Sequence, residues 1–262
     1  MARGRGTEEA ARPAPGACSS GAGPGSMGQA SHQKEGRELA MGGAARPGEP
    51  DHYRSPSDIV GILDGQPAAA AALALCCAER LSAIAEHMAR SSSAGATVRA
   101  GLDLGWSAAA GRGPGRGALG RAISDLDHLL GSPDIKIGQL LYLDDAICAA
   151  RYALEAVRDG SLTAARNAVA RCEDIYFQLT ASIWPLIGLE AQLESPIMRE
   201  EVARQVRDAQ AIAAWGGAVP AQSLAALRQA AHADGEVLVE LIRGVTQQPP
   251  DDPHPAGQLT LF

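Results

Sequence analysis

The chain has 262 residues, of which 46% are hydrophobic but only 3% aromatic, so a core would consist mainly of Ala, Leu, Ile and Val. The net charge is −7 at pH 7, and residues 51–262 carry 17 Lys and Arg against 25 Asp and Glu. This surplus of acidic residues has the wrong sign for holding phosphate groups, so direct binding of nucleic acid is not expected.

Residues 1–52 are rich in Gly, Ala, Pro and Ser without hydrophobic periodicity, which predicts disorder. From residue 53 to about 244, apolar residues recur at helical spacing. The predicted helices span residues 66–90, 97–110, 118–130, 139–158, 162–181, 196–215 and 221–243. Short connections favour antiparallel neighbours, so the sequence predicts an all-α fold, a single antiparallel bundle of about seven helices.

Several boundaries have specific signals. Gly160 is a helix stop, and Ser161 is the expected N-cap of the next helix. Ser195 and Pro196 combine an N-cap with proline at the first helical position. In the first long helix, one apolar face is expected at spacings of three and four. That face comprises Leu73, Cys76, Cys77, Leu81, Ile84 and Met88.

The five cysteines give no sign of a disulfide framework or a metal centre, because no Cys-x-x-Cys spacing and no His cluster accompanies them. They are Cys18, Cys76, Cys77, Cys148 and Cys172. The last four fall in apolar helical patterns, where free Cys is usually a small buried hydrophobic residue. No apolar stretch follows Arg3 and Arg5, and no apolar run reaches about 18 residues. We expect a reduced, cytoplasmic protein with no cofactor, no metal and no membrane contact.

Several short motifs stand out across residues 70–244. They are Cys77-Ala78-Glu79-Arg80, Leu102-Asp103-Leu104-Gly105-Trp106, Asp145-Ala146, Tyr152-Ala153-Leu154-Glu155-Ala156-Val157, Ser195-Pro196 with Glu200-Glu201, and Glu236-Val237-Leu238-Val239-Glu240-Leu241-Ile242-Arg243. These motifs resemble those of the YjaG-like bacterial family, a domain of unknown function. The resemblance implies an all-helical single domain and no particular activity.

The charged residues in these motifs allow two interpretations. Glu79, Arg80 and Asp103 would form an ion-pair network that fixes the register of the helices, and Asp145 would be a further member of this polar set. Alternatively, Glu79, Asp103 and Asp145 would carry out acid–base chemistry or hold a metal. No Glu-x-x-His motif accompanies them, and no nucleophile motif is present, so we favour the network and assign no catalytic residue.

Beyond the helices, the Pro-rich and acidic residues 245–257 have the composition of a solvated linker with a reach of roughly 20–35 Å. The five residues that follow, Gln258-Leu259-Thr260-Leu261-Phe262, resemble the peptide by which bacterial proteins bind the DNA polymerase sliding clamp. The resemblance implies that Leu261 and Phe262 fill a hydrophobic pocket, Gln258 fixes orientation and Leu259 adds a secondary contact. An equally weighted alternative is that these apolar residues fold back onto a groove of the same protein.

The sequence therefore favours a non-enzymatic helical interaction module, tethered to the sliding clamp and acting near replication or repair. The second hypothesis is a protein whose helical surface binds the partner, for example a toxin that it neutralises, with an incidental tail. An enzyme using the bundle's carboxylates comes third. Homo-oligomerisation is left open.

Overall fold

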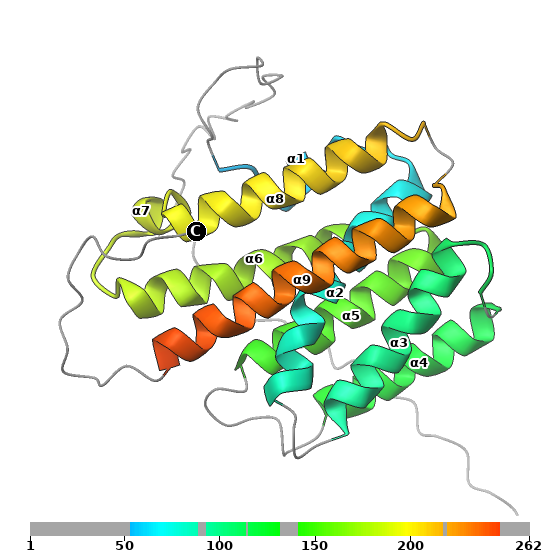
Figure 1. Cartoon of the computed structure of the whole chain (residues 1–262), viewed down its shortest axis with the longest axis horizontal. Coiled ribbons are helices and arrows are strands. Elements are labelled where there is room, and N and C mark those ends of the chain that lie inside the picture. Colours follow the sequence, from blue (N-terminus) through cyan, green and yellow to red (C-terminus); the bar gives the residue numbers. More distant parts are fainter. Residues whose placement is uncertain (1–52, 89–92, 114, 132–140, 217–218, 247–262) are drawn as a thin grey trace, which may run out of the picture. The chain divides into compact units, whose positions relative to one another are not determined.

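Nine helices form the regular secondary structure of the residues that the structure describes. The computed structural model describes residues 53–88, 93–113, 115–131, 141–216 and 219–246. Its helices are α1 (Pro56–Gly61), α2 (Pro67–Met88), α3 (Ala94–Ala109), α4 (Arg116–Leu130), α5 (Leu141–Asp159), α6 (Leu162–Ile183), α7 (Leu189–Leu193), α8 (Pro196–Ala213) and α9 (Ala221–Thr246). These residues contain no strand, and the predicted all-α bundle is confirmed (Figure 1).

The seven longer helices were predicted from the sequence, whereas α1 and α7 were not. Helices of six and five residues are too short to show a hydrophobic period. In α1, Ser55 and Asp58 form a capping box, and the buried residues Ile59 and Val60 lie in a helix that packs against α6 and α8. So short a helix depends on these tertiary contacts, because its own backbone hydrogen bonds cannot compensate for the entropy lost on ordering.

The boundary signals in the sequence act as predicted. The Ser161 hydroxyl accepts a hydrogen bond from the amide of Ala164 at 3.1 Å, and that of Ser195 accepts from the amide of Met198 at 3.3 Å. Gly160 ends α5 with φ +67°, a conformation that favours glycine. Local capping therefore accounts for where α6 and α8 begin.

Helix α2 is the core helix of the bundle, and it packs against α3, α5, α6, α8 and α9. Residues 69–85 are buried on every side, whereas the sequence predicted a single apolar face. The stretch Pro67–His87 is long and apolar enough to cross a membrane, but 94% of its most apolar window is buried inside the protein. Its hydrophobicity is thus accounted for by the surrounding helices.

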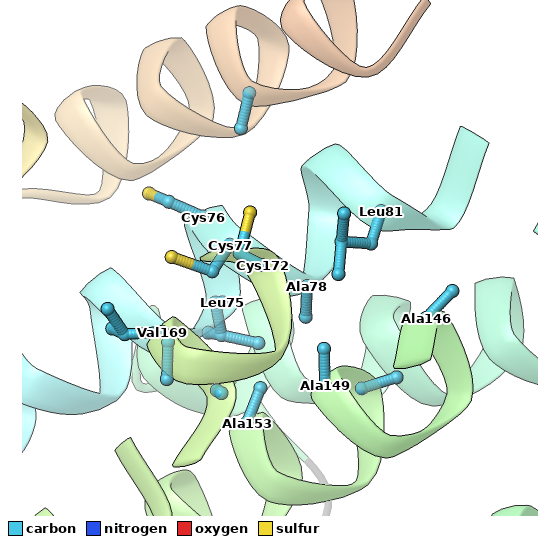
Figure 2. Packing of buried hydrophobic residues seen from close by; sticks show 14 of the residues in the cluster. Leu75, Cys76, Cys77, Ala78, Leu81, Ala146, Ala149, Ala153, Val169 and Cys172 are labelled. Carbon is cyan, nitrogen blue, oxygen red and sulfur yellow. The ribbon is translucent and has the colours of Figure 1, made fainter. Parts of the chain in front are cut away.

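Small side chains let the helices approach α2 closely. Figure 2 shows Cys77 and Ala78 of α2 beside Cys172 of α6 and Ala149 of α5. At Gly235 of α9, an added Cβ would lie 2.3 Å from a backbone carbonyl oxygen of α2. This position therefore requires glycine for the contact between α2 and α9. The cysteines of the described residues are free, and Cys76, Cys77 and Cys172 are buried as predicted, while Cys148 is partly exposed.

Candidate functional site

The four charged residues predicted from the sequence lie in three separate clusters rather than in one network. Glu79 and Arg80 are neighbours on α2, and their side chains contact different residues, with α9 the one helix that they share. Glu79 faces α3 and α9, whereas Arg80 faces α8 and α9. Adjacent residues on a helix differ by about 100° in direction, and α2 has helices on all sides, so each side chain meets its own set of partners.

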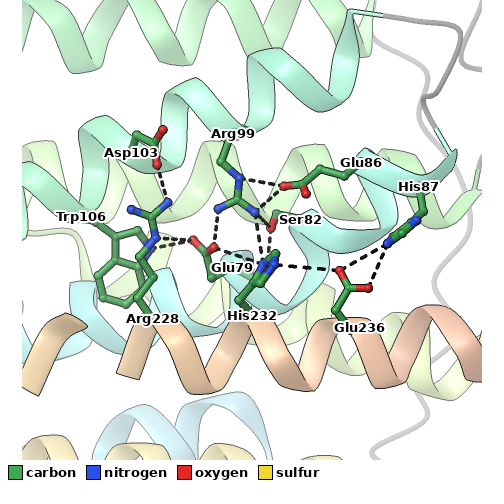
Figure 3. Close-up of polar contacts among 10 residues, drawn as sticks. All are labelled: Glu79, Ser82, Glu86, His87, Arg99, Asp103, Trp106, Arg228, His232 and Glu236. Atoms are coloured by element: carbon green, nitrogen blue, oxygen red, sulfur yellow. Dashed lines mark hydrogen bonds and ion pairs between the residues drawn. The ribbon is translucent and has the colours of Figure 1, made fainter. Parts of the chain in front are cut away.

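The first group, which we call the Glu79 cluster, joins α2 to α3 and α9 (Figure 3). Its members are Glu79, Ser82, Glu86, Arg99, Asp103, Trp106, Arg228, His232 and Glu236. The carboxylate of Glu79 is 1% exposed, accepts a hydrogen bond from Arg99 and accepts another from the indole N–H of Trp106 at 2.8 Å. Arg228 of α9 lies 3.3 Å from the same carboxylate. A buried charge is tolerated at this position because these donors surround it.

Asp103 belongs to the Glu79 cluster through Arg228. The Arg228 guanidinium donates to the carboxylate of Asp103, which is half exposed on α3. One arginine from α9 therefore joins a carboxylate of α2 to a carboxylate of α3. An arrangement with this geometry fixes the register of three helices, because a shift of any of them would break a charged hydrogen bond.

The second group, the Arg80 cluster, joins α2 to α6, α8 and α9. Its members are Arg80, Cys172, Glu201, Arg204, Gln205, Asp208 and Asp234. Arg80 is fully buried, donates to Glu201 at 2.6 Å and also pairs with Asp208. Burial opposes ionisation of Glu201, but Arg80 and Arg204 outweigh it and hold the pKa of this carboxyl below its ordinary value. Glu201 is therefore a buried anion in a cationic environment.

Asp145 lies apart from both clusters. Its carboxylate accepts hydrogen bonds from Arg171 at 3.1 Å and Gln178 at 2.9 Å, and both partners belong to α6. Glu79, Asp103 and Asp145, considered together for acid–base chemistry, thus do not converge on a common point. Among the described residues, these carboxylates are bound by arginines, a histidine, an indole and an amide of the protein itself.

Two hollows in the described part of the chain have different linings. One of about 310 Å³ is lined by small apolar residues where α2 and α9 begin and where α3 and α5 end. The other, about 530 Å³, lies between α3 and α4 and includes Arg121 and Asp125. None of the four predicted charged residues lines either hollow. No group of three or more His, Cys, Asp or Glu among the described residues is arranged to hold a metal ion.

The sequence offered little to identify the partners in these clusters. Arg80 stands four residues from both Cys76 and Ile84 on a largely apolar helix, and a charge in such a position indicates a buried ion pair. Its partners on α8 and α9 lie more than a hundred residues further along the chain. The sequence also gave no indication of Glu173 of α6, which is buried and accepts a hydrogen bond from Tyr53.

The predicted peptide residues Gln258, Leu259, Leu261 and Phe262 lie outside the described residues. No protein-family model matches this chain, and no curated protein or solved structure matches it at a significant level. The resemblance of residues 70–244 to the YjaG-like family therefore stays a prediction, as does that of the peptide to clamp-binding segments.

Proposed function

We propose that this protein is a non-enzymatic helical interaction module of the cytoplasm, tethered to the DNA polymerase sliding clamp by the peptide Gln258–Phe262. The sequence of this peptide, which residues 247–257 separate from the end of α9, is the observation that carries the proposal. In this proposal the tether raises the local concentration of the helical domain, and of any molecule bound to it, at sites of replication or repair.

The attachment of α9 supports this proposal. Helix α9 leads into the tail, and it is held against α2 by the Glu79 cluster through Arg228 and by the Arg80 cluster through Asp234. Gly235 brings its backbone against α2 next to these contacts. A partner that binds the tail would thus be connected to the core helix through a firmly packed element, so tethering would keep the whole domain within reach of the clamp.

The test is the binding of purified sliding clamp from the same organism to the full chain. The matched variants are a triple change, Gln258→Ala, Leu261→Ala and Phe262→Ala, and the single change Thr260→Ala at the variable position of the motif. We expect binding near the micromolar range, typical of short peptides that order on binding. The triple variant should lose it and the Thr260→Ala variant should keep it. No binding at concentrations of about 50 µM would refute the proposal.

A second candidate function is supported by two exposed leucines, one in the loop between α6 and α7 and one at the start of α7. Leu186 is 98% exposed and Leu189 is largely exposed, while large apolar side chains of this kind usually lie inside a protein. This favours a protein whose helical surface binds the partner. Two variants distinguish the candidates. Removal of residues 247–262 abolishes function if the protein acts through its tail peptide. The double change Leu186→Ser and Leu189→Ser abolishes function if the protein acts through its helical surface.

A further inference from the structure

Tyr53, just before α1, is hydrogen-bonded to a buried carboxyl group that has no cation partner among the described residues. The Tyr53 hydroxyl donates to Oε2 of Glu173 on α6 at 2.8 Å. The Glu173 residue is 5% exposed, and its other oxygen, Oε1, is buried without a hydrogen-bond partner in the same part of the chain. Glu79 and Glu201, by contrast, are each surrounded by guanidinium groups. Glu173 is thus the buried carboxyl whose ionised form the fold supports least.

The charged groups that act most strongly on the pKa values of this pair are acidic. Asp174 on α6 and Glu201 on α8 act on Glu173, and Asp58 on α1 acts on Tyr53. Burial is the largest effect on Glu173; together with the two acidic neighbours it outweighs the hydrogen bond from Tyr53 and raises the pKa of Glu173 to about 8. The carboxyl therefore holds a proton at neutral pH, and this proton is lost within the mildly alkaline range.

The segment that Tyr53 begins is packed onto the bundle by apolar residues. Ile59 and Val60 of α1 are buried, as is Leu63 just after it. Helix α1 packs against α6 and α8, which also contact each other. Residues 53–63 therefore cover an apolar seam between α6 and α8, and the bond from Tyr53 to Glu173 joins the start of this segment to α6.

We propose that Tyr53 and protonated Glu173 form a latch that holds residues 53–63 on α6 and α8, and that loss of the proton loosens this segment and uncovers the seam. When the proton leaves, a carboxylate remains in a buried, acidic environment with one hydrogen-bond donor. Opening of the segment relieves this because water then reaches the carboxylate. The latch is independent of the tail peptide and of clamp binding.

The direction of the pH dependence follows from linkage. The closed segment holds the Glu173 proton more tightly than the open one, so the closed form is most stable below the ordinary pKa of Glu and is weakened as pH rises towards 8. If opening restores the ordinary pKa, the opening equilibrium rises roughly 50-fold between pH 6 and pH 8. Above pH 8 it levels off at roughly 100-fold over its value at pH 6.

Amide hydrogen exchange of the full chain between pH 6 and pH 9 tests this, with rates corrected for the intrinsic effect of pH. We expect the amides of residues 59–63 to lose protection by the factors above, while the amides of α2 keep theirs, which separates local opening from global unfolding. In Glu173→Gln the amides of residues 59–63 should keep the same protection across this pH range. Glu190→Gln, which removes one exposed carboxylate from α7, should behave as the wild type.

Two results would overturn the latch. One is a wild-type segment whose protection does not change across this range, and the other is an unchanged loss in Glu173→Gln. Tyr53→Phe gives a further check, because it keeps the ring and removes the donor. Its segment should be less protected at every pH, and the alkaline transition should move to higher pH, since the hydrogen bond from Tyr53 lowers the pKa of Glu173. A Tyr53→Phe variant that behaves identically to the wild type would also refute the latch.

Discussion

Replacement of Arg80 by methionine tests whether the buried ion pairs stabilise the fold. Arg80 is fully buried, and it contacts the equally buried Glu201 and the largely buried Asp208. Methionine fills a similar volume without a charge. The change leaves Arg204 as the remaining cation paired with Glu201, and it leaves Asp208 without the guanidinium of Arg80.

The expected cost is large because the carboxylates stay buried after their cation is removed. Breaking a buried pair in this way costs about 3–5 kcal/mol, whereas a small domain has only about 5–15 kcal/mol of stability in total. A companion chain that also carries Glu201→Gln and Asp208→Asn removes the two carboxylate charges that Arg80 neutralised. We expect it to regain at least half of the loss, since neutral groups need no counterion.

The pH dependence gives a second signature. In the wild type the pKa of Glu201 is lowered, so its stabilising effect is present above the ordinary pKa of Glu and is lost as pH falls. Without Arg80 the balance shifts towards the burial effect, and protonation of Glu201 then relieves part of the cost. The loss of stability in Arg80→Met should therefore be smaller at pH 5 than at pH 7.

Urea denaturation followed by circular dichroism measures these free energies of unfolding. Arg116→Met is the matched control, because Arg116 is 76% exposed and pairs with Asp159 on the surface, where loss of a pair costs less than about 1 kcal/mol. Two results would contradict a stabilising role of the buried ion pairs. One is a loss of unfolding free energy in Arg80→Met that is no larger than in this control at pH 7. The other is a loss that is larger at pH 5 than at pH 7.

Four further substitutions test helix packing, helix capping and surface exposure, by urea denaturation in each case. Gly235→Ala should cost at least about 2 kcal/mol because its Cβ would overlap the α2 backbone. Gly244→Ala is the control in the same helix, where an added Cβ meets no atom, and it should stabilise the protein by about 0.5–1 kcal/mol. Equal effects of the two changes would contradict the close approach of α2 and α9. Ser195→Ala removes the N-cap of α8 and should cost about 1–2 kcal/mol, and an unchanged midpoint would exclude a stabilising cap. Leu186→Ser should change stability by less than about 0.5 kcal/mol, since a larger loss would mean that this side chain packs in the core.

Much of the fold could be predicted because the signals for long helices are local. Ser161 and Ser195 satisfy amides three residues away, and Gly160 provides a left-handed turn at the end of α5. Such interactions depend on neighbours in the chain alone. The short helices α1 and α7 were missed, because six and five residues are too few to show a hydrophobic period.

The partners of the charged groups of α2 could not be predicted from neighbouring residues in the chain. The sequence singled out Glu79, Arg80 and Asp103 as polar residues in helical segments, and all three do lie in ion pairs. That Glu79 and Arg80 serve different clusters follows only from the burial of α2 on every side.

Glu173 was not singled out at all, since nothing in its neighbourhood along the chain distinguishes it from an exposed helical glutamate. The amino-acid sequence by itself determined the helical class, most helix boundaries and the presence of a peptide that resembles a docking motif. Only the tertiary structure decided which charges are neutralised and which buried carboxyl has no cation partner among the described residues, because these pairings join residues that are distant in the chain and meet through packing of the helices.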